Sequence, residues 1–506
     1  MEKKAFYITT TLPYVNAEAH MGHALEFIRA DIIARYKKTQ GYEVFFNTGT
    51  DEHGQKLFDT AASAGKEVKA YVDEYAEKFK ELLPLLGVSE DIHFVRTTDV
   101  HHEKAAQEFW KRVEKNGFIY KKNYKAKYCV GCEENKTESE LVDGKCPIHP
   151  NRELEIIEEE NYFFKFSAFG KKLLELYDSG KFRIVPEFRM NEMREFIKSD
   201  GSGLQDFSIS RLKTKMSWGI PVPGDENHVM YVWFDALVNY ISTLGWPEDT
   251  VTFEKFWKNG TPTQYCGKDN TRFQSIMWQA MLIAADLPNT NTVVVNGFVT
   301  GEGGIKMSKS LGNVVNPVDI VNEYGTDALR YFVAREIGSF EDSPFTIERF
   351  KAAYNSGLAN GLGNLTSRLL KLSTTHDIKL TEEKLNSVIP LGTNIILNFE
   401  AFNIKNVADY AWALVQGIDK GIQETQPFKL VKSEIQAEKE KGKELISKYL
   451  LELMRITSII SPIIPGTAKT IQTLIKENKM PEKPLFLRKE KKKSPTQSSG
   501  SLLPGS

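Results

Sequence analysis

The first 54 residues run in an order that few folds share: strand, turn, helix, strand. Residues 5–10 (AFYITT) are typical of a buried strand, and apolar residues at helical spacing predict a helix over residues 20–34. A second apolar run, in GYEVFFNTGTDEHG, ends in a polar loop at residues 48–54. This order begins a doubly wound parallel α/β sheet, whose ligands bind at the carboxyl ends of the strands. We therefore expect residues 12–23 and 49–53 to lie at one edge of the sheet.

Later segments divide the chain further. Short strands, turns and a cysteine cluster replace the α/β pattern in the middle of the chain, which indicates an insertion. The α/β pattern then returns in three apolar runs, at residues 228–234, 264–267 and 292–299. The expected parts are a Rossmann-like catalytic domain in two halves (1–118 and 228–346), an insertion (119–227), an all-α bundle (347–480) and a charged, low-complexity, disordered tail (481–506).

Composition excludes several classes of protein. Sixty-six Lys and Arg residues oppose 67 Asp and Glu residues, so a nucleic acid can be met only by a local basic patch. The 41% hydrophobic and 26% charged content is that of a folded protein. The uncharged run at residues 456–468 is short and contains two prolines, so it does not predict a membrane span. Four cysteines are too few for a disulfide framework, and we expect a cytoplasmic enzyme.

A histidine pair, in His20-Met21-Gly22-His23, opens the first predicted helix. Histidines three residues apart share a helix face, and the free N–H groups of a helix N-terminus attract phosphate. Gly22 would let a nucleotide approach the backbone. Taken alone, two histidines this close are more typical of a surface or of a metal site.

A lysine-rich motif, KMSKS at residues 306–310, follows the glycine-rich segment GEGG. Lys306 and Lys309 on a hinged loop can close over a triphosphate and neutralise charge as pyrophosphate leaves. Taken alone, a solvated Lys/Ser loop explains the motif as well.

Three cysteines and a histidine lie in two short pairs. Cys129 and Cys132 form the first pair, Cys146 and His149 form the second, and each pair can hold one side of a tetrahedral zinc ion. Four filled positions predict one closed, structural zinc site. Buried thiols without a metal are the alternative, and Cys266 is most simply such a thiol.

HMGH and KMSKS together resemble the class I aminoacyl-tRNA synthetases, with Met21 a conservative departure from the usual motif. Further segments are similar to the methionyl-tRNA synthetases with a single zinc knuckle: TLPYVNAEAHMGH, GTDEHG, YVWFDAL, GKD, GFVTGEGGIKMSKS and GNLTSR. The resemblance covers residues 4–487. It implies a ligase that activates L-methionine with ATP and Mg²⁺ and charges tRNA(Met), initiator included, with no membrane and no stable protein partner.

The resemblance also implies a role for individual residues. Those at the methionine site are Leu12, Tyr14, Asp51, Trp233, Ala236, Tyr240 and Gln274, with Asp51 on the ammonium and Arg211 paired with Asp51. Those at the ATP site are His20, Gly22, His23, Gly267, Asp269 and Lys309, and the catalytic set is His20, His23, Lys306 and Lys309. The anticodon residues are Asn364, Arg368 and Phe428. Without the resemblance, Trp233 and Tyr240 would be ordinary core residues, Asp51 and Arg211 would be surface charges, and Asn364 and Arg368 would be a polar pair on one helix face.

Two positions depart from the family pattern. Gln274 stands where the family usually has histidine, so it must orient a pocket tyrosine through its amide. Phe428 stands where the family commonly has tryptophan, and it offers a smaller ring for stacking on a base.

Two rivals remain at this stage. A cysteinyl enzyme would hold zinc at its active site with an open position, whereas four ligands in the insertion fit a closed site. A zinc-containing tRNA-binding protein that no longer catalyses would not need both HMGH and KMSKS. Because the chain ends in a short charged tail, we expect a monomer.

Overall fold

The computed structural model describes residues 3–132, 134–136, 140–198, 204–305, 307, 315–386 and 391–489. They form two compact units. We call the first the sheet unit (Met1–Phe345, Leu391–Ala408 and Pro462–Ile464) and the second the helical unit (Thr346–Pro390, Asp409–Ser461 and Pro465–Ser506).

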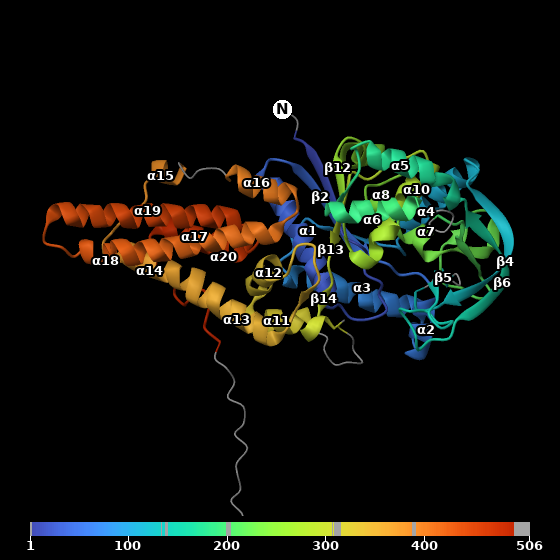
Figure 1. Cartoon of the computed structure of the whole chain (residues 1–506), viewed down its shortest axis with the longest axis horizontal. Coiled ribbons are helices and arrows are strands. Elements are labelled where there is room, and N and C mark those ends of the chain that lie inside the picture. Colours follow the sequence, from blue (N-terminus) through green and yellow to red (C-terminus); the bar gives the residue numbers. More distant parts are fainter. Residues whose placement is uncertain are drawn as a thin grey trace, which may run out of the picture. The chain divides into compact units, whose positions relative to one another are not determined.

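A six-stranded parallel sheet forms the centre of the sheet unit (Figure 1). Its strands, in spatial order, are β3 (His93–Arg96), β2 (Glu43–Thr50), β1 (Ala5–Thr9), β12 (Thr261–Gly267), β13 (Thr292–Asn296) and β7 (Arg183–Val185). Strand order runs outward in opposite directions from β1 and β12, which pair in parallel. This arrangement confirms the predicted doubly wound sheet, and it leaves a crevice beyond the carboxyl ends of β1 and β12.

Helix α1 (Met21–Thr39) follows β1 and covers the sheet. Nearly all of its apolar side chains are buried, as expected for a helix packed against a parallel sheet. It begins where the sequence predicts, and it extends five residues beyond the predicted end at residue 34. Its N-terminus lies next to the crevice.

The inserted segment forms a second sheet. Strands β4 (Ile119–Cys129) and β6 (Glu155–Phe164) are a long antiparallel pair, with β5 (Glu134–Lys136) and β8 (Phe207–Ser208) at its edges (Figure 1). A smaller sheet joins β10 (Pro221–Val222), β11 (Asp225–Met230) and β9 (Ser210–Leu212). Strand β7 also comes from the predicted insertion, yet it pairs with β13 at the edge of the central sheet.

Two of the apolar runs each divide into two elements. In the run 228–234, β11 stops at Met230 and helix α7 (Val232–Ala236) follows. The run 292–299 breaks after β13, and β14 (Val299–Thr300) pairs instead with β15 (Ser343–Pro344). At Gly297 a Cβ would lie 2.2 Å from the backbone of Glu341, so only glycine fits this break.

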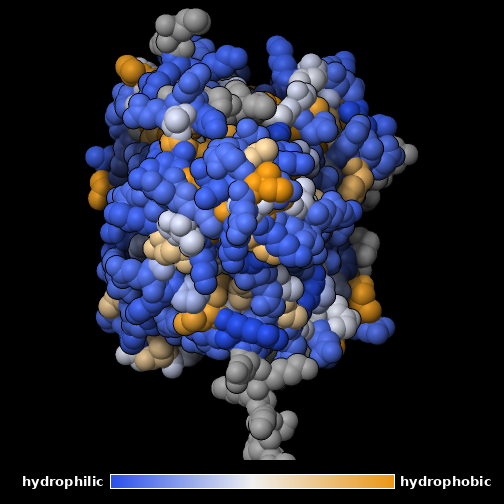
Figure 2. Space-filling view, turned by 90° about the vertical axis from the view of Figure 1, so that its left-hand side faces the viewer, coloured by the Kyte–Doolittle hydropathy of each residue, from blue (hydrophilic) through white to orange (hydrophobic). Residues whose placement is uncertain are grey.

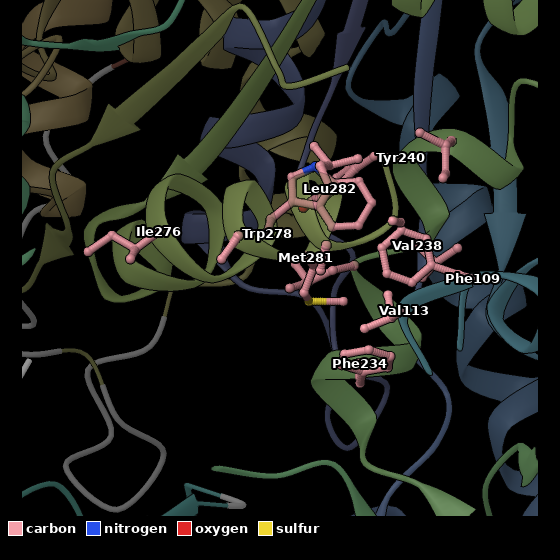
Figure 3. Packing of buried hydrophobic residues seen from close by; sticks show 14 of the residues in the cluster. Phe109, Val113, Phe234, Val238, Tyr240, Ile276, Trp278, Met281 and Leu282 are labelled. Atoms are coloured by element: carbon pink, nitrogen blue, oxygen red, sulfur yellow. The ribbon is translucent and has the colours of Figure 1, made fainter. Parts of the chain in front are cut away.

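The core of the sheet unit gathers large side chains from segments far apart in sequence. Figure 3 shows Phe109, Phe234, Trp278 and Met281 packed together, and each is fully buried. The rings of Phe109 and Trp278 stack with centroids 5.7 Å apart. Phe109 thus links α10 (Trp278–Ala284) to α7, and α7 carries residues at the crevice.

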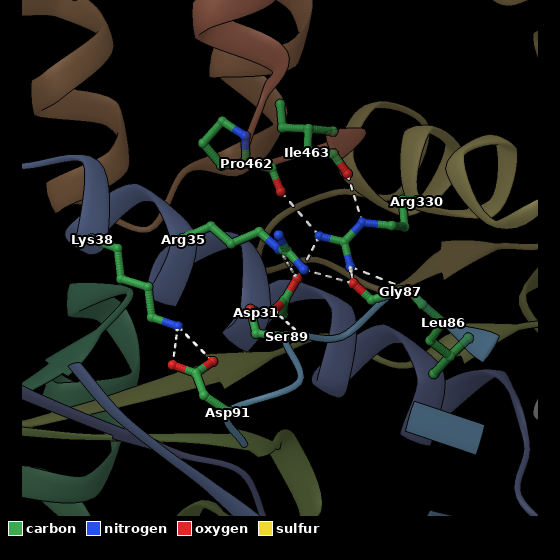
Figure 4. A network of polar contacts seen from close by, with 10 residues as sticks. All are labelled: Asp31, Arg35, Lys38, Leu86, Gly87, Ser89, Asp91, Arg330, Pro462 and Ile463. Atoms are coloured by element: carbon green, nitrogen blue, oxygen red, sulfur yellow. Dashed lines mark hydrogen bonds and ion pairs between the residues drawn. The ribbon is translucent and has the colours of Figure 1, made fainter. Parts of the chain in front are cut away.

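A buried ion pair joins α1 to α12 (Thr326–Arg335) (Figure 4). Asp31 Oδ2 and Arg330 Nη2 lie 2.7 Å apart with neither side chain exposed, and Arg330 also donates to the carbonyls of Pro462 and Ile463. Burial alone would raise the pKa of Asp31, but the positive charges of Arg330 and Arg35 lower it. The pair therefore holds two charges inside the unit at neutral pH.

The helical unit confirms the predicted all-α region. Helices α14 (Asn364–Thr375), α19 (Gln436–Ile460) and α20 (Pro465–Glu477) pack against one another, and Trp412 of α17 (Ile404–Thr425) donates to the carbonyl of Gly357. Its other helices are α13 (Ile347–Ala353), the π-helical segment Tyr354–Gly363, α15 (Glu382–Asn386) and α18 (Pro427–Leu430). Residues 481–489 contain no helix or strand, and the rest of the predicted tail lies outside the described residues.

The remaining helices of the sheet unit are α2 (Gln55–Ser63), α3 (Val68–Leu85), α4 (Val100–Lys115), α5 (Gly170–Asp178), α6 (Glu187–Lys198), α8 (Asn239–Ser242), α9 (Thr250–Phe253), α11 (Pro317–Tyr324) and α16 (Thr393–Glu400).

Figure 2 shows a mostly hydrophilic face of the molecule with scattered hydrophobic side chains. Among the described residues, no helix has the length and apolar character of a membrane span.

Candidate active site

A cavity of about 410 Å³ lies at the crevice of the central sheet. It brings together residues from the HMGH segment, from the carboxyl ends of β1, β2, β12 and β13, and from α7 and α8. The predicted methionine and ATP residues that line it are Leu12, Tyr14, His20, Gly22, His23, Asp51, Trp233, Ala236, Tyr240, Gly267, Asp269 and Gln274. Residues distant in sequence therefore share one cavity.

The two histidines of HMGH cap the N-terminus of α1. His20 Nδ1 accepts from the backbone N–H of Gly22 at 3.1 Å, and His23 Nδ1 accepts from the N–H of His20 at 3.3 Å. The rings stack with centroids 3.8 Å apart, and burial lowers the pKa of His23 well below its usual value. A neutral imidazole that accepts at Nδ1 carries its hydrogen at Nε2. Both rings can therefore donate from Nε2 to an anion in the cavity.

Two carboxyl groups, of Glu26 and Asp269, line the cavity near the end of β12. Glu26 Oε1 accepts from the backbone N–H of Thr11 at 2.6 Å, and burial, with a smaller effect of Asp269, raises the pKa of Glu26 to about 8. A Cβ on Gly267 would lie 2.7 Å from Asp269 Oδ1. A side chain at position 267 would therefore displace this carboxylate from the end of β12.

Backbone contacts hold the segment after β1 against the end of β2. The N–H of Asp51 donates to the carbonyl of Pro13 at 2.9 Å, and the N–H of Val15 donates to the carbonyl of Asp51. These bonds place Tyr14 beside Asp51, whose side chain is mostly buried. A buried carboxylate next to an aromatic ring suits an ammonium group.

Aromatic side chains form the apolar end of the cavity. Trp233 stacks on Phe273 with ring centroids 3.8 Å apart. Tyr240 is fully buried, and the side-chain amide of Gln274 donates to its hydroxyl oxygen. Gln274 thus orients the tyrosine through its amide, as the sequence predicts.

A buried network lies behind α7. Asp235 accepts from His53 Nδ1 at 2.7 Å and from His102 Nε2 at 2.8 Å, and His102 Nδ1 lies 2.8 Å from Ser242 Oγ. Burial would lower the pKa of His53, but the carboxylate of Asp235 raises it. Because Asp235 lies between Trp233 and Ala236, this network anchors the helix turn that carries both.

Other predicted residues lie outside the cavity lining. Arg211 is buried, donates to Ser208 Oγ and to the carbonyl of Ser210, and lies over the rings of Tyr128 and Tyr231. Its pairing with Asp51 stays a prediction. Lys306 and Lys309 lie outside the described residues.

The cysteine cluster is preassembled. The ligand atoms of Cys129, Cys132, Cys146 and His149 all lie within 4.8 Å of one another. Sγ of Cys132 is 3.5 Å from Sγ of Cys146 and 3.2 Å from Nδ1 of His149, spacings compatible with a shared tetrahedral metal ion. A Cβ on Gly131 would lie 2.6 Å from the ring of His149, so the turn requires glycine. Gly131 and Cys132 also line the cavity.

The predicted anticodon residues lie in the helical unit. Asn364 and Arg368 are one turn apart on α14, where Asn364 is exposed and Arg368 forms an ion pair with Asp419 of α17. Phe428 is half-buried on α18. An arginine, an amide and an aromatic ring are groups that can read unstacked bases, and that these three residues act together stays a prediction.

Sequence reasoning missed several residues of the cavity wall. Glu26, Lys56, Asn239 and Asn296 all line it. Arg29, donating to Asn296 Oδ1 at 2.8 Å, holds that amide, and no partner for Asn296 Nδ2 is found within the described chain. Asn296 ends an apolar strand next to β12, and this position alone could have indicated it.

Known proteins share both the sequence and the architecture. The family described as "tRNA synthetases class I (M)" matches residues 6–155 and 151–370. Methionine–tRNA ligase of Caldanaerobacter subterraneus is 41% identical over 480 residues, which are 92% of this chain and 73% of that protein. The enzyme of a Nostoc species is 40% identical over 93% of this chain and 89% of its own.

A solved structure agrees with these relatives. Mycobacterium tuberculosis methionyl-tRNA synthetase in complex with methionyl-adenylate has a TM-score of 0.86 and 34% identity, with 93% of this chain and 94% of that chain covered. The predicted HMGH, GKD and zinc-knuckle segments all fall inside the matched region. With one cavity at the switch point of its sheet and relatives of this kind over nearly its whole length, the chain belongs to the methionine–tRNA ligases, a family of class I tRNA synthetases.

Proposed function

We propose that this chain activates L-methionine with ATP and transfers the methionyl group to the 3′-terminal adenosine of tRNA(Met), including the initiator. One observation carries the proposal: a single cavity holds the HMGH helix start, the carboxylate of Asp51, an aromatic end and the GKD segment. These groups suit a phosphate, an ammonium, an apolar side chain and a ribose in turn.

Activation joins the methionine carboxylate to the α-phosphorus of ATP and releases pyrophosphate. Charge then accumulates on the phosphate oxygens, where the Nε2–H groups of His20 and His23 donate. Lys306 and Lys309, on the motif that the family places over the triphosphate, would neutralise the leaving pyrophosphate. Positioning and charge stabilisation supply most of the rate in such chemistry, so no covalent enzyme intermediate is needed.

The methionine would lie between Asp51 and the aromatic end. Asp51 accepts from its ammonium group, and Leu12, Trp233, Ala236 and Tyr240 surround its side chain. Gly267 and Asp269 meet the ribose of ATP, because glycine allows close approach and the carboxylate accepts from hydroxyl groups. Mg²⁺ would enter on the phosphate oxygens of ATP, as part of that substrate.

The cysteine cluster fits one structural zinc ion. Three thiolates and an imidazole are its preferred ligands, and all four side chains are used. Zinc there would fix the turn around Gly131, which borders the cavity. The helical unit would read the CAU anticodon through Asn364, Arg368 and Phe428, and the reaction belongs in the cytoplasm, where tRNA is charged.

Charging of tRNA tests the proposal beyond the activation step. We expect methionine to be attached to a tRNA(Met) transcript, and Arg368→Gln to lower its kcat/KM by about tenfold or more, the effect of one base contact. Methionine-dependent ATP–pyrophosphate exchange should not change. Lys371→Gln removes an exposed charge from the same helix and serves as the control. Equal charging by both variants would contradict the anticodon assignment.

A further inference from the structure

A chain of buried amide and hydroxyl groups leads from α10 to Tyr240. Gln279, Thr290, Gln264 and Gln274 form it in that order, and none of these side chains is more than 1% exposed. The residues come from four places: α10, the segment before β13, strand β12 and the π-helical turn Phe273–Met277. Each of these buried polar groups lowers the stability of the fold unless it is fully hydrogen-bonded, so a set this large suggests a function.

The direction of the chain is set at its far end by backbone groups, which cannot reverse. The backbone N–H of Thr290 donates to Gln279 Oε1 at 3.2 Å, which identifies that atom of the amide as the oxygen and the other as the nitrogen. That nitrogen donates to the carbonyl of Gln274 at 2.9 Å and to Thr290 Oγ1 at 3.1 Å. The hydroxyl oxygen of Thr290 is therefore an acceptor for Gln279, and its hydrogen is free to donate elsewhere.

Each further step follows from the one before. Thr290 Oγ1 donates to Gln264 Oε1 at 2.6 Å, and Gln264 Nε2 donates to Gln274 Oε1 at 2.7 Å. Gln274 Nε2 then donates to the hydroxyl oxygen of Tyr240. The reverse direction would leave the buried hydroxyl hydrogen of Thr290 without its acceptor, which is costly in a site closed to water.

This direction of the chain determines what the hydroxyl group of Tyr240 can do. Because an amide nitrogen cannot accept, the O–H of Tyr240 cannot point at Gln274 and must find its acceptor elsewhere. Tyr240 lines the cavity, and its ring lies edge-on to Trp278 with centroids 5.8 Å apart (Figure 3). Because the described residues offer the Tyr240 hydroxyl no hydrogen-bond partner besides Gln274, its hydrogen is available to an acceptor at the apolar end of the cavity.

We propose that Gln264, Thr290 and Gln279 are positioning residues, which set the Gln274 amide so that Tyr240 donates to the sulfur of bound methionine. This inference rests on the proposed function. A thioether sulfur accepts and cannot donate, whereas the methylene of norleucine at the same place does neither. Norleucine would leave the Tyr240 hydrogen unpaired in a desolvated site. The relay therefore selects sulfur over methylene.

Gln264→Glu tests the direction of the relay. An ionised glutamate accepts at both oxygens, so the amide of Gln274 must turn its nitrogen towards residue 264. Its oxygen then faces Tyr240, and the O–H of Tyr240 donates to Gln274 instead of to the substrate. At low pH the protonated carboxyl group can donate again and restore the original direction. Burial raises the pKa of such a carboxyl group, which brings this switch near neutral pH.

The experiment compares kcat/KM for methionine and norleucine in ATP–pyrophosphate exchange, at pH 6 and at pH 8.5. Both substrates are run on the same preparation, so a loss of folded enzyme cancels in the ratio. For Gln264→Glu we expect the methionine-to-norleucine ratio to fall about threefold to tenfold at pH 8.5, the effect of one neutral hydrogen bond, and to recover at pH 6. Gln264→Met, which has no polar group to donate, should lower the ratio at both pH values.

Thr292→Val is the matched control, because Thr292 is as buried as Thr290 but bonds to Arg183 and Asn291. Its ratio should equal that of the wild type. If Gln264→Glu does not fold, Gln264→Met and Thr290→Val against Thr292→Val decide the matter. Ratios equal to the control in the Gln264 variants would overturn the relay alone. A wild-type chain that activates no methionine would overturn the proposed function and the relay with it.

Discussion

At the scale of single residues, the cavity depends on groups whose protonation differs from that in water. Burial holds Glu26 with a pKa of about 8, so it is largely neutral at pH 7 and its Oε1 accepts from Thr11 while the group carries a proton. A neutral carboxyl group beside Asp269 avoids a second negative charge on the cavity wall, which under the proposed function would favour the entry of a phosphate. Neutral His23 adds a donor at the same place.

The sequence predicted many of the residues that line the cavity, but not all of its wall. Asp51, Trp233 and Tyr240 were found through motifs, whereas Glu26 and Asn296 occur in apolar runs that read as ordinary core. Their roles depend on which strand ends meet, and strand order is not visible in one sequence. The groups behind Gln274 were missed for the same reason, because Gln264 lies on β12 and Thr290 in the segment before the neighbouring strand β13.

Glu26→Gln tests the protonation of this residue. The folded state binds the Glu26 proton more tightly than the unfolded state. The contribution of this proton to the free energy of unfolding is therefore complete below pH 4.5 and is lost as pH rises towards 8. Gln cannot ionise, so we expect the melting temperature of the variant to gain on that of the wild type between pH 5 and pH 8. The slope is at most about 1.4 kcal/mol per pH unit. Parallel curves in thermal melts would contradict the raised pKa.

At the scale of elements, local patterns gave the right element types where one periodicity dominates. Helix α1 was found because its apolar positions recur at helical spacing, and it continues past residue 34 because Tyr36 and Lys37 are buried too. The run 228–234 did not show where the strand ends and the helix begins, because a short apolar segment fits a strand and a buried helix turn equally well. The cluster of Cys129, Cys132, Cys146 and His149 was predictable, since its members are close in sequence as well as in space.

Cys146→Ser tests the knuckle. We expect the wild type to carry about one zinc ion per chain, and the variant to lose it, because serine is a poor ligand for zinc. Since Gly131 and Cys132 border the cavity, the rate of methionine-dependent exchange should fall as well. Zinc is measured by elemental analysis of protein purified without chelator.

Cys266→Ser makes the same change at a buried thiol of β12, away from the knuckle. Its zinc content should match that of the wild type. Zinc retained after Cys146→Ser, or absent from the wild type, would show that the cluster is not the metal site.

At the scale of the whole molecule, contacts distant in sequence hold the sheet unit together. Arg330 joins α12 to Asp31 of α1 and to the carbonyls of residues 462 and 463 (Figure 4). No sequence pattern identified this pair, because its members are 299 positions apart. The doubly wound sheet was nevertheless predictable from the first strand, helix and strand alone.

Asp31→Asn tests the buried pair. The change leaves the Arg330 charge buried without its partner, and we expect the free energy of unfolding to fall by about 3–5 kcal/mol. Asp91→Asn breaks the exposed pair of Asp91 with Lys38, drawn in the same figure, and should cost no more than about 1 kcal/mol. Urea unfolding of both variants compares them. Equal losses would show that the buried pair has no special weight.

The most direct test of the proposed function is ATP–pyrophosphate exchange with methionine, cysteine, leucine, isoleucine and valine, each run separately on folded, zinc-loaded protein. The proposed function predicts strong exchange with methionine alone, and its loss in Lys309→Ala. Exchange driven by another amino acid would keep the class of enzyme but contradict the methionine site. No exchange with any of the five would contradict the catalytic function itself.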